Sequence, residues 1–176
     1  MTVQIRFAAP DDAAALHRLA AITFPLACPP DALPESIAEF IALNLSERSF
    51  TEYLADPERE LFVADEDGEL LGYTMLVYGE PSDPDVSAAV TVRPTAELSK
   101  VYVHPDHHGA GLAAALVERS VAAAVARGSR SVWLGVNQQN ARANRFYEKQ
   151  GFARVGTKRF KVGARYEDDF VLERGL

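Results

Sequence analysis

Apolar residues recur along this chain with two different periods, and each period predicts one kind of element. In Val3–Phe7 every second position is apolar, as is typical of a strand at the edge of a sheet. After Gly109 the apolar positions follow the turns of a helix, from Leu112 to Val125. The same patterns predict helices at 11–22, 35–45, 49–55, 109–127 and 138–150, and strands at 3–7, 60–64, 70–77, 90–92, 98–103, 131–136, 152–161 and 166–172.

Turns and loops separate these elements without dividing the chain. Asp67-Gly68 predicts a hairpin turn, because both residues tolerate the positive φ that tight hairpin turns require. The proline-rich stretch 25–34 and the polar stretch 79–87 are expected to be loops. Helical patterning resumes directly after residues 25–34, so this stretch does not link two domains. No segment of the sequence repeats. With 176 residues, 48% of them hydrophobic, we expect one domain over 1–176 with a substantial core.

The composition narrows the class of protein. The net charge is −7, from 18 basic and 25 acidic residues, so a nucleic-acid partner is not expected. Charges interrupt the longest apolar runs, and the N-terminus lacks the pattern of a signal peptide, so no membrane partner is expected. The one cysteine, Cys28, can form no internal disulfide, which fits a cytoplasmic protein. We interpret Cys28 as a small apolar filler.

The segment Val101–Ala113 is the candidate ligand-binding loop. It predicts a β-branched strand, a polar turn and a helix entered through Gly109-Ala110-Gly111. The first backbone N–H groups of a helix have no partners within the helix and attract anions, and small side chains let a phosphate approach them. His104, His107 and His108 lie in the same turn, where we expect them to face solvent rather than to bind a metal.

Three alternatives compete with this phosphate-binding loop. An ordinary connection between a strand and a helix has the same pattern. A Walker A loop needs lysine followed by serine or threonine, and no such pair follows Gly111. A dinucleotide-binding loop needs a third glycine, where this chain has Ala114, and an acid at the end of the next strand, which 131–134 lacks. Both nucleotide-binding alternatives are therefore disfavoured.

A second motif follows the strand that ends at Val136. Within the predicted helix 138–150, Asn140, Asn144 and Tyr147 are spaced to share one face. Two turns of helix cover about 10 Å, so an amide and a phenol could contact an extended ligand at two places. The alternative is that Tyr147 and its neighbour Phe146 are core aromatic residues.

Taken together, the two motifs resemble those of the GNAT family of acyl-CoA-dependent N-acetyltransferases. The family's phosphate loop, (Gln/Arg)-x-x-Gly-x-(Gly/Ala), is similar to His108–Ala113, from which only His108 departs. The family's second motif resembles the asparagine helix that ends in Phe146-Tyr147-x-x-x-Gly151-Phe152. The resemblance covers Leu98–Phe152. The run through 131–169 further resembles the branch that contains bacterial spermine/spermidine acetyltransferases.

The resemblance implies an α/β (α+β) fold with acetyl-CoA as co-substrate. We expect a mixed central sheet of about seven strands, splayed at the cofactor site and flanked by about four helices. Tyr147 would be the general acid for the thiolate, and Asn140 would contact the pantetheine arm. The remaining cofactor-binding residues would be Val101, Tyr102 and Val103 on the strand, and His108, Gly109, Ala110, Gly111, Leu112, Ala113 and Ala114 in the loop and helix.

The resemblance leaves the general base open. Some relatives carry a glutamate where this chain has Gly135, and others carry it where this chain has Glu97. We favour Glu97, acting directly or through water; the alternative is an exposed charge at the start of a strand. Acids at Asp169, Glu35 and Glu39 are candidates for the acceptor groove.

The expected function is transfer of an acetyl group to a primary amine of a small molecule, with a polyamine or another small alkyl amine favoured. A protein N-terminal or lysine acetyltransferase is the alternative within the class. A catalytically silent acyl-CoA-binding sensor is the alternative of another class. The acceptor, the pathway and the oligomeric state, a homodimer included, stay open.

Overall fold

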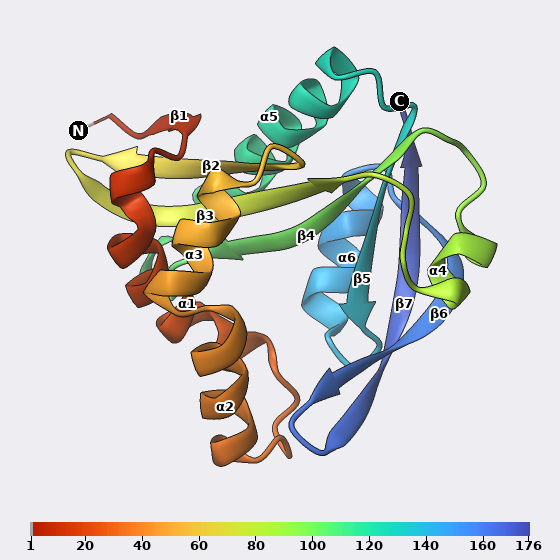
Figure 1. Ribbon diagram of the computed structural model, residues 1–176, viewed down its shortest axis with the longest axis horizontal. Coiled ribbons are helices and arrows are strands. Elements are labelled where there is room, and N and C mark those ends of the chain that lie inside the picture. Colours follow the sequence, from red (N-terminus) through yellow and green to blue (C-terminus); the bar gives the residue numbers. More distant parts are fainter. Residues whose placement is uncertain (1) are drawn as a thin grey trace.

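The computed structural model describes residues 2–176 and arranges them around one mixed sheet (Figure 1). Within these residues the sheet has seven strands in the order β1-β2-β3-β4-β5-β7-β6. Each neighbouring pair is antiparallel except β4 and β5, which are parallel. The expected mixed sheet is therefore confirmed. Its strands are β1 (Gln4–Phe7), β2 (Arg59–Glu66), β3 (Glu69–Tyr78), β4 (Thr95–Val103), β5 (Ser131–Asn137), β6 (Ala153–Val162) and β7 (Arg165–Gly175).

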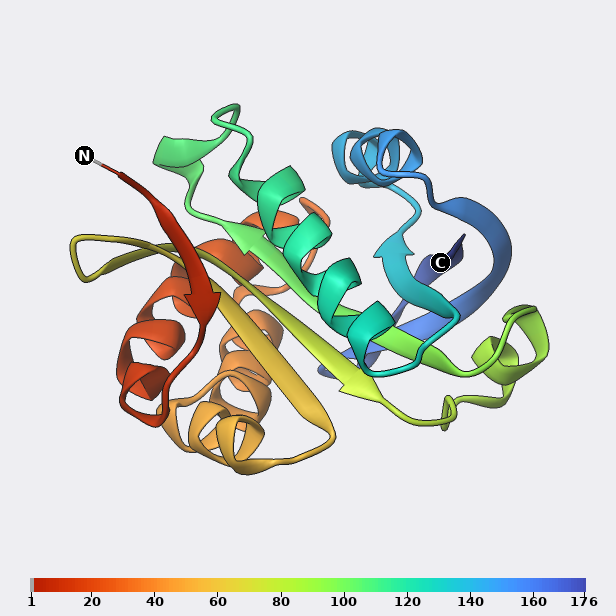
Figure 2. The same cartoon turned by 90° about the horizontal axis from the view of Figure 1, so that it is seen from above.

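Helices cover both faces of the sheet (Figure 2). The first three helices of the chain lie against one face of the sheet, and α5 and α6 lie against the opposite face. In the part of the chain that the structure describes, none of the helices is long and apolar enough to span a bilayer. The helices are α1 (Ala13–Ala27), α2 (Pro34–Asn44), α3 (Glu47–Ala55), α4 (Pro84–Ala89), α5 (Leu112–Ala126) and α6 (Ala141–Lys149), with 3₁₀ turns at Pro10–Asp12 and Pro105–His107.

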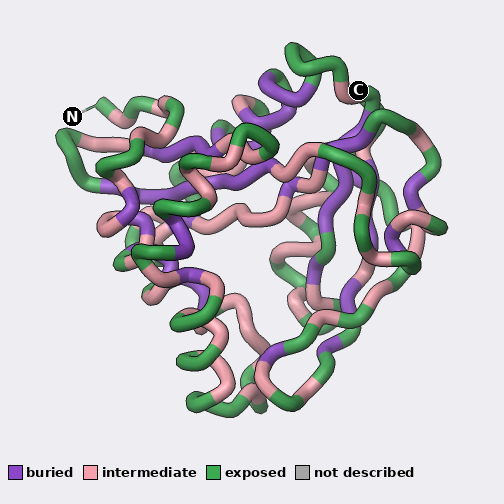
Figure 3. Tube along the Cα trace, viewed as in Figure 1, coloured by how far each residue is buried: buried purple, intermediate pink, exposed green. Residues whose placement is uncertain are grey.

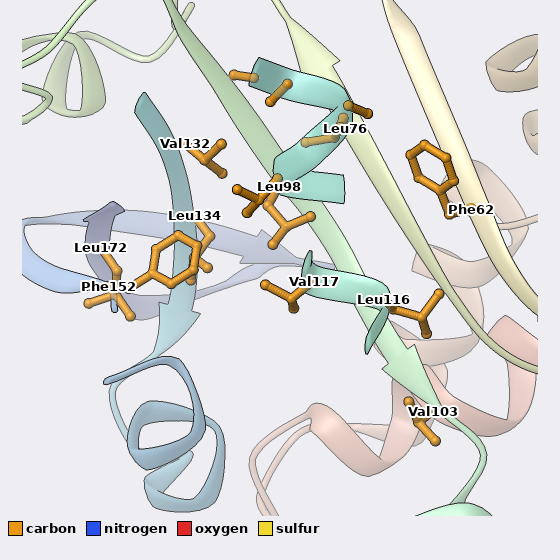
Figure 4. Close-up of a cluster of buried hydrophobic side chains, with 14 of the residues drawn as sticks. Phe62, Leu76, Leu98, Val103, Leu116, Val117, Val132, Leu134, Phe152 and Leu172 are labelled. Carbon is orange, nitrogen blue, oxygen red and sulfur yellow. The ribbon is translucent and has the colours of Figure 1, made fainter. Parts of the chain in front are cut away.

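Two hydrophobic cores lie on the two faces, and Figure 3 shows the buried strands running between them. The first core, between the sheet and helices α5 and α6, includes Leu98, Leu116, Leu134 and Phe152 (Figure 4). The second core lies under α1 and α3 and includes Leu16, Phe50, Tyr73 and Met75. A third, smaller cluster holds α4 against β5 and β7 through Val86, Trp133 and Val171.

A β-bulge in β4 changes which face its side chains occupy. Leu98 pairs with Leu76 and Lys100 pairs with Met75, so Ser99 is an extra residue opposite the β3 ladder. Ala96 and Leu98, then Val101 and Val103, all contact the first core, so the regular alternation is shifted by one residue between the two pairs. The bulge therefore leaves Glu97, Lys100 and Tyr102 on the opposite face, toward the second core.

Strands β4 and β5 diverge after a short stretch of pairing. They pair only at Thr95–Ser131, Ala96–Val132 and Glu97–Trp133, although both strands continue beyond these positions. Strand β5 stays paired with β7 along its whole length, to Asn137–Asp169. Figure 1 shows the two strands separating toward their carboxyl ends. The expected splay of the sheet is therefore present.

The structure corrects several expected elements. Residues 90–92 form no strand, because the backbone N–H groups of Thr91 and Val92 donate instead to the Glu173 carboxylate, at 2.9 and 3.2 Å. The expected loop 79–87 contains part of α4, which Asp83 caps by accepting from the Asp85 N–H at 2.9 Å. The described residues contain six α-helices, because α4 is added to the five that the sequence patterns predict. Helix α1 continues beyond the expected end at Ile22 to Ala27, with Pro25 inside its last turn.

Candidate functional site

A cleft of about 410 Å³ opens where β4 and β5 diverge. Its walls come from both faces of the sheet. Residues of α6 and of the first core line one side, and residues of α1, α2, β6 and β7 line the other. Because no strand pairing closes the sheet beyond Glu97 and Trp133, the cleft connects the two faces. We call these sides the helix-α6 side, lined by Val101, Val103, Asn140, Ala143 and Tyr147, and the hairpin side, lined by Phe24, Phe40, Lys158, Phe160, Glu167 and Asp169.

The edge of β4 presents backbone groups to the cleft. The His104 N–H donates to the Leu71 carbonyl on β3 at 2.7 Å. Alternate residues of an antiparallel strand bond the same neighbour, so Tyr102 also bonds β3, while Val101 and Val103 direct their N–H and C=O groups to the other edge. The side chain of Tyr102 contacts the second core, whereas those of Val101 and Val103 face the first core and the cleft.

The glycine loop ends at the N-terminus of α5. Gly111 is the N-cap residue and adopts φ 78°, and Gly109 adopts φ 83°, both in the left-handed region that glycine tolerates. A Cβ at either position would meet no atom within 4 Å, so conformation, not space within the chain, requires glycine. The Ala115 N–H donates to the Gly111 carbonyl at 3.1 Å, which leaves the N–H groups of Leu112–Ala114 without partners inside the helix. This cradle fits a diphosphate.

The ring of His108 connects β4 to α6. Its Nε2 donates to the Val103 carbonyl at 2.9 Å, and its Nδ1 lies 2.9 Å from Nη1 of Arg142. Since the guanidinium can only donate, Nδ1 is the acceptor in this contact. His108 is thus held on both nitrogens, rather than simply facing solvent as expected. Among residues 2–176, no three side chains of His, Cys, Asp or Glu gather in a way that could hold a metal ion.

The asparagine motif has a more structural role than its spacing indicates. Asn140 is the N-cap of α6, and its Oδ1 accepts from the Ala143 N–H at 3.1 Å. Its amide nitrogen, for which no partner is found among residues 2–176, stays available to a ligand. Asn144 donates to the carbonyls of Asn137 and Asn140, at 3.0 and 2.8 Å, and does not line the cleft. The cap also explains why the helix begins at Ala141 rather than at 138.

Tyr147 lines the cleft one turn beyond Ala143. Its ring packs edge-on against Phe146 at 5.2 Å and Phe152 at 5.9 Å. No group of residues 2–176 hydrogen-bonds its hydroxyl, which leaves that group free for a ligand. Burial raises the pKa of Tyr147 above its usual value, so the phenol stays protonated at neutral pH. Tyr147 thus contributes to the first core and also presents a proton donor.

Glu97 is half-buried and lines the cleft where the two strands separate, so it is not an exposed charge at a strand end. Burial raises the pKa of Glu97, and the nearby Lys158 ammonium opposes that shift. Asp169 lies on the same side of the cleft, 3.6 Å from Nζ of Lys158, and burial raises its pKa to about 6. Lys100, also on this side, has its pKa lowered by burial to about 8.

The acceptor residues expected from the sequence are only partly brought together. Asp169 lines the cleft, but Glu35 and Glu39 are exposed on α2 and do not. The sequence analysis missed Lys158, Glu167 and Arg142. Lys158 stands directly opposite Asp169 in the β6–β7 ladder, so pairing the hairpin around Gly163 would have found it. The contact of Arg142 with His108, 34 residues away, carries no such signal.

An aromatic wall closes the outer part of the hairpin side. Phe24 stacks on Phe40 with ring centroids 4.5 Å apart, and Phe40 lies 5.4 Å from Phe160. Glu167, only 9% exposed, lines the cleft nearby, with Arg165 at 3.8 Å. Cys28 also lies here; burial raises the pKa of its thiol to about 11, so it is protonated at neutral pH.

Known proteins share the sequence pattern and the fold of this chain. A model of the acetyltransferase (GNAT) family matches residues 16–152. An uncharacterized N-acetyltransferase of Mycobacterium tuberculosis is 48% identical over 165 residues, which cover 94% of this chain and 98% of that protein. The fold matches the PaiA N-acetyltransferase of Thermoplasma acidophilum in complex with coenzyme A, with a TM-score of 0.79, 19% identity and full coverage of both chains.

A solved acetyltransferase of Salmonella typhimurium with its cofactor acetyl-CoA is 25% identical, with a TM-score of 0.65, covering 100% of this chain and 95% of that one. The loop at the N-terminus of α5, the divergence of β4 and β5 and the tyrosine of α6 all lie within the part that the family model matches. The chain therefore belongs to the GNAT family and is an acetyl-CoA-dependent N-acetyltransferase.

Proposed function

We propose that this N-acetyltransferase acetylates a primary amine of a small cationic alkyl amine, of which a polyamine is the favoured example. The observation that carries the proposal is the asymmetry of the cleft. Its helix-α6 side offers backbone N–H groups to an anion, and its hairpin side offers buried carboxylates beside three phenylalanine rings. Carboxylates and aromatic faces are the groups that attract an alkylammonium ion.

The helix-α6 side would hold acetyl-CoA. The N–H groups of Leu112–Ala114 would bind the diphosphate, with the guanidinium of Arg142 nearby. The backbone edge of Val101 and Val103 and the amide nitrogen of Asn140 would bind the pantetheine arm. This arrangement would bring the thioester to the point where β4 and β5 separate, between the two sides of the cleft.

The reacting amine would attack the thioester carbonyl from the hairpin side. Glu97 would accept the amine proton, directly or through water. Its raised pKa lies closer to neutral pH, where a general base is most effective. The Val103 N–H would stabilise the negative charge that develops on the carbonyl oxygen. As the C–N bond forms and the C–S bond breaks, the hydroxyl of Tyr147 would donate its proton to the leaving sulfur.

The charges of the hairpin side favour a cationic acceptor over a peptide. Glu97, Glu167 and Asp169 all line the cleft, and the net charge of −7 adds to the attraction of cations. A polyamine presents ammonium groups along a narrow alkyl chain, which suits a groove walled by rings and carboxylates. A protein N-terminus or lysine would bring a peptide backbone, whose neutral amide groups gain nothing from the rings and carboxylates of the hairpin side.

A thiol-release assay tests the proposal. Purified protein and acetyl-CoA are incubated with spermidine, spermine, straight-chain diamines, neutral-tailed amines and an N-terminal peptide. We expect release of CoA with the polyamines and diamines, and a KM for spermidine that rises with salt, because salt screens the attraction between the polycation and the acidic surface beyond about 10 Å at 0.1 M. Release with the peptide alone would overturn the polyamine proposal. Tight binding of acetyl-CoA without release for any acceptor would favour the sensor alternative.

A further inference from the structure

Glu167 on β7 is a buried carboxylate whose charge is only partly balanced. It is 9% exposed and lines the cleft. Within residues 2–176 no group hydrogen-bonds its side chain, and its ion pair with Nη2 of Arg165 is long, at 3.8 Å. The same guanidinium donates to the backbone carbonyl of Asp31 at 2.8 Å and to the Asp31 carboxylate at 3.0 Å. Two carboxylates therefore share one guanidinium, and Glu167 has the weaker contact.

The neighbouring pair on the same face of the hairpin shows how this carboxylate differs from Asp169. Asp169 faces Lys158 across the β6–β7 ladder, whereas Glu167 faces Phe160. The ammonium of Lys158 lies 3.6 Å from Asp169 and 5.3 Å from the centre of the Phe160 ring. The chain itself thus places one cation beside a carboxylate and this aromatic ring. For Glu167 the opposite strand supplies the ring and no cation.

The strand register places Glu167 at the outer end of the hairpin side. Glu97 pairs with Trp133 on β5, and β5 pairs with β7 as far as Asn137 and Asp169. Glu167 lies two residues beyond Asp169, about 7 Å further along the strand from the level of Glu97. Figure 1 shows β6 and β7 continuing past the end of β5 toward α2. A ligand that extends from Glu97 to Glu167 therefore passes Asp169.

Aromatic rings surround this outer end. The ring of Phe160 lies 5.4 Å from that of Phe40, which stacks on Phe24, and all three line the cleft. Ring faces attract an ammonium group, and a site removed from water strengthens the attraction between that group and a carboxylate. The rings also offer an apolar surface to the methylenes of an alkyl chain. An amine with a second cation matches these groups better than an amine with a neutral tail.

We propose that Glu167 binds the second ammonium group of the acceptor, so that the enzyme selects diamines and polyamines over monoamines. The proposal rests on the proposed function, because it concerns the acceptor of that same site. The Glu167 carboxylate would hold one end of the acceptor against the Phe160 ring. The amine at the other end would reach the thioester where β4 and β5 separate. Glu167 is thereby a specificity-determining residue that takes no part in the chemical step.

Replacement of single side chains tests this role. The rate of CoA release is measured at neutral pH for straight-chain α,ω-diamines and for monoamines of the same length with a neutral tail. Glu167→Gln removes the charge and keeps the shape, and Phe160→Leu removes the ring. Asp168→Asn, at the exposed neighbouring residue of β7, is the matched control. The informative quantity is the ratio of kcat/KM for the diamine to kcat/KM for the monoamine.

We expect Glu167→Gln to lower this ratio by about tenfold to hundredfold, the scale of a hydrogen bond to a charged group. The change should appear as a higher KM for the diamine rather than as a lower kcat, because Glu167 touches no reacting atom. Phe160→Leu should lower the ratio by about twofold to fivefold, the scale of an exposed cation–π contact. Asp168→Asn should keep the ratio of the wild type.

The outcomes separate the two proposals. A wild type that acetylates diamines and monoamines equally well, or a ratio that Glu167→Gln leaves unchanged, would overturn the role of Glu167 and leave the proposed function intact. A wild type that releases no CoA with any amine would overturn the proposed function.

In that second case calorimetry tests Glu167 alone. The complexes of CoA with wild type and with Glu167→Gln are titrated with spermidine. Weaker binding by Glu167→Gln than by wild type would support the role of Glu167 in holding an ammonium group. Equal binding by the two proteins, or no binding by either, would overturn that role.

Discussion

The two sides of the cleft are built from different kinds of groups. On the helix-α6 side, backbone N–H groups of Val103 and Leu112–Ala114 do most of the proposed binding, and the residues lie close together in the sequence. On the hairpin side, side chains from α1, α2, β4, β6 and β7 converge, and they come from opposite ends of the chain. A ligand that all relatives share can be bound by backbone geometry, whereas a ligand that differs among relatives requires side chains.

The comparison predicts different effects for changes on the two sides. Changes on the helix-α6 side should affect kcat and the affinity for acetyl-CoA, while changes on the hairpin side should affect the choice of acceptor and the pH dependence of stability.

The largest expected effect is on the helix-α6 side, at Tyr147. Tyr147→Phe keeps the packing against Phe146 and Phe152 but removes the proton donor. Because a general acid contributes roughly 10²–10⁴-fold to rate, kcat should fall by that factor while the affinity for acetyl-CoA changes little. Tyr166→Phe, at an exposed tyrosine that does not line the cleft, is the control. A kcat within about twofold of wild type across neutral and alkaline pH would mean that Tyr147 serves only packing.

On the hairpin side, the stability of the protein should depend on the ionisation of Asp169. Its pKa is raised from 3.8 to about 6, mainly by burial, so the folded protein binds a proton more tightly than the unfolded chain does. The free energy of unfolding should therefore fall as pH rises between these two values, by about 1–3 kcal/mol from this group. Urea unfolding at a series of pH values measures the change.

Asp169→Asn should remove that part of the pH dependence, whereas Asp168→Asn, at the exposed neighbouring residue, should not. The same fall in both variants would contradict the assignment to Asp169. Since Lys158 loses its partner in the first variant, the slope against pH is the informative quantity rather than the stability at any one pH.

A further test of the helix-α6 side is Gly111→Val. Valine would have to adopt φ 78° and would place a branched side chain where the diphosphate approaches. Acetyl-CoA affinity should fall by tenfold or more, about 1.4 kcal/mol, when measured by calorimetry. Gly68→Val is a matched control, because Gly68 adopts φ 90° in a hairpin turn outside the cleft and should lose stability alone. Equal acetyl-CoA affinities for the two variants would show that Gly111 is not part of a phosphate-binding loop.

The smallest effect on acetyl-CoA affinity should come from a charged side chain on the helix-α6 side. Arg142→Ala removes a partly exposed cation beside the loop, and exposed charge pairs contribute roughly 0.2–1 kcal/mol. Acetyl-CoA affinity should therefore fall only about twofold to fivefold, and less at high salt. Arg145→Ala, on the same helix and outside the cleft, should change neither quantity. A loss as large as that of Gly111→Val would show that side-chain charge, not the backbone cradle, dominates on this side.

The same difference between the two sides decides how much the sequence could predict. Local patterns located β1–β3, the helices α2, α3 and α5, and the terminal hairpin, because each depends on periodicity or on a turn nearby. The glycine loop and Tyr147 were found for the same reason. Residues 90–92 were misassigned because their N–H groups bond Glu173, about 80 positions later in the chain, which no local pattern reveals.

The hairpin side depends on strand register, which the sequence does not state. Lys158 contacts Asp169 only because β6 and β7 pair in one register, and its side chain extends over Gly135, where a Cβ would lie 2.5 Å from its Cε. Asn140 shows what residue spacing leaves out. Its spacing predicts a ligand contact, and the structure adds that its Oδ1 caps the N-terminus of α6.

The extra residue at Ser99 has a consequence for variation in this chain. It shifts the alternation of β4, so that Glu97 and Tyr102 point to the same layer although they are five positions apart, an interval that would place them on opposite faces of a regular strand. Deleting Ser99 would restore a regular ladder but force either Glu97 into the layer of α5 or Tyr102 out of the layer of α1. A substitution of Ser99 would leave the register of β4 against β3 unchanged, whereas its deletion would exchange the layers that the side chains on one side of it enter.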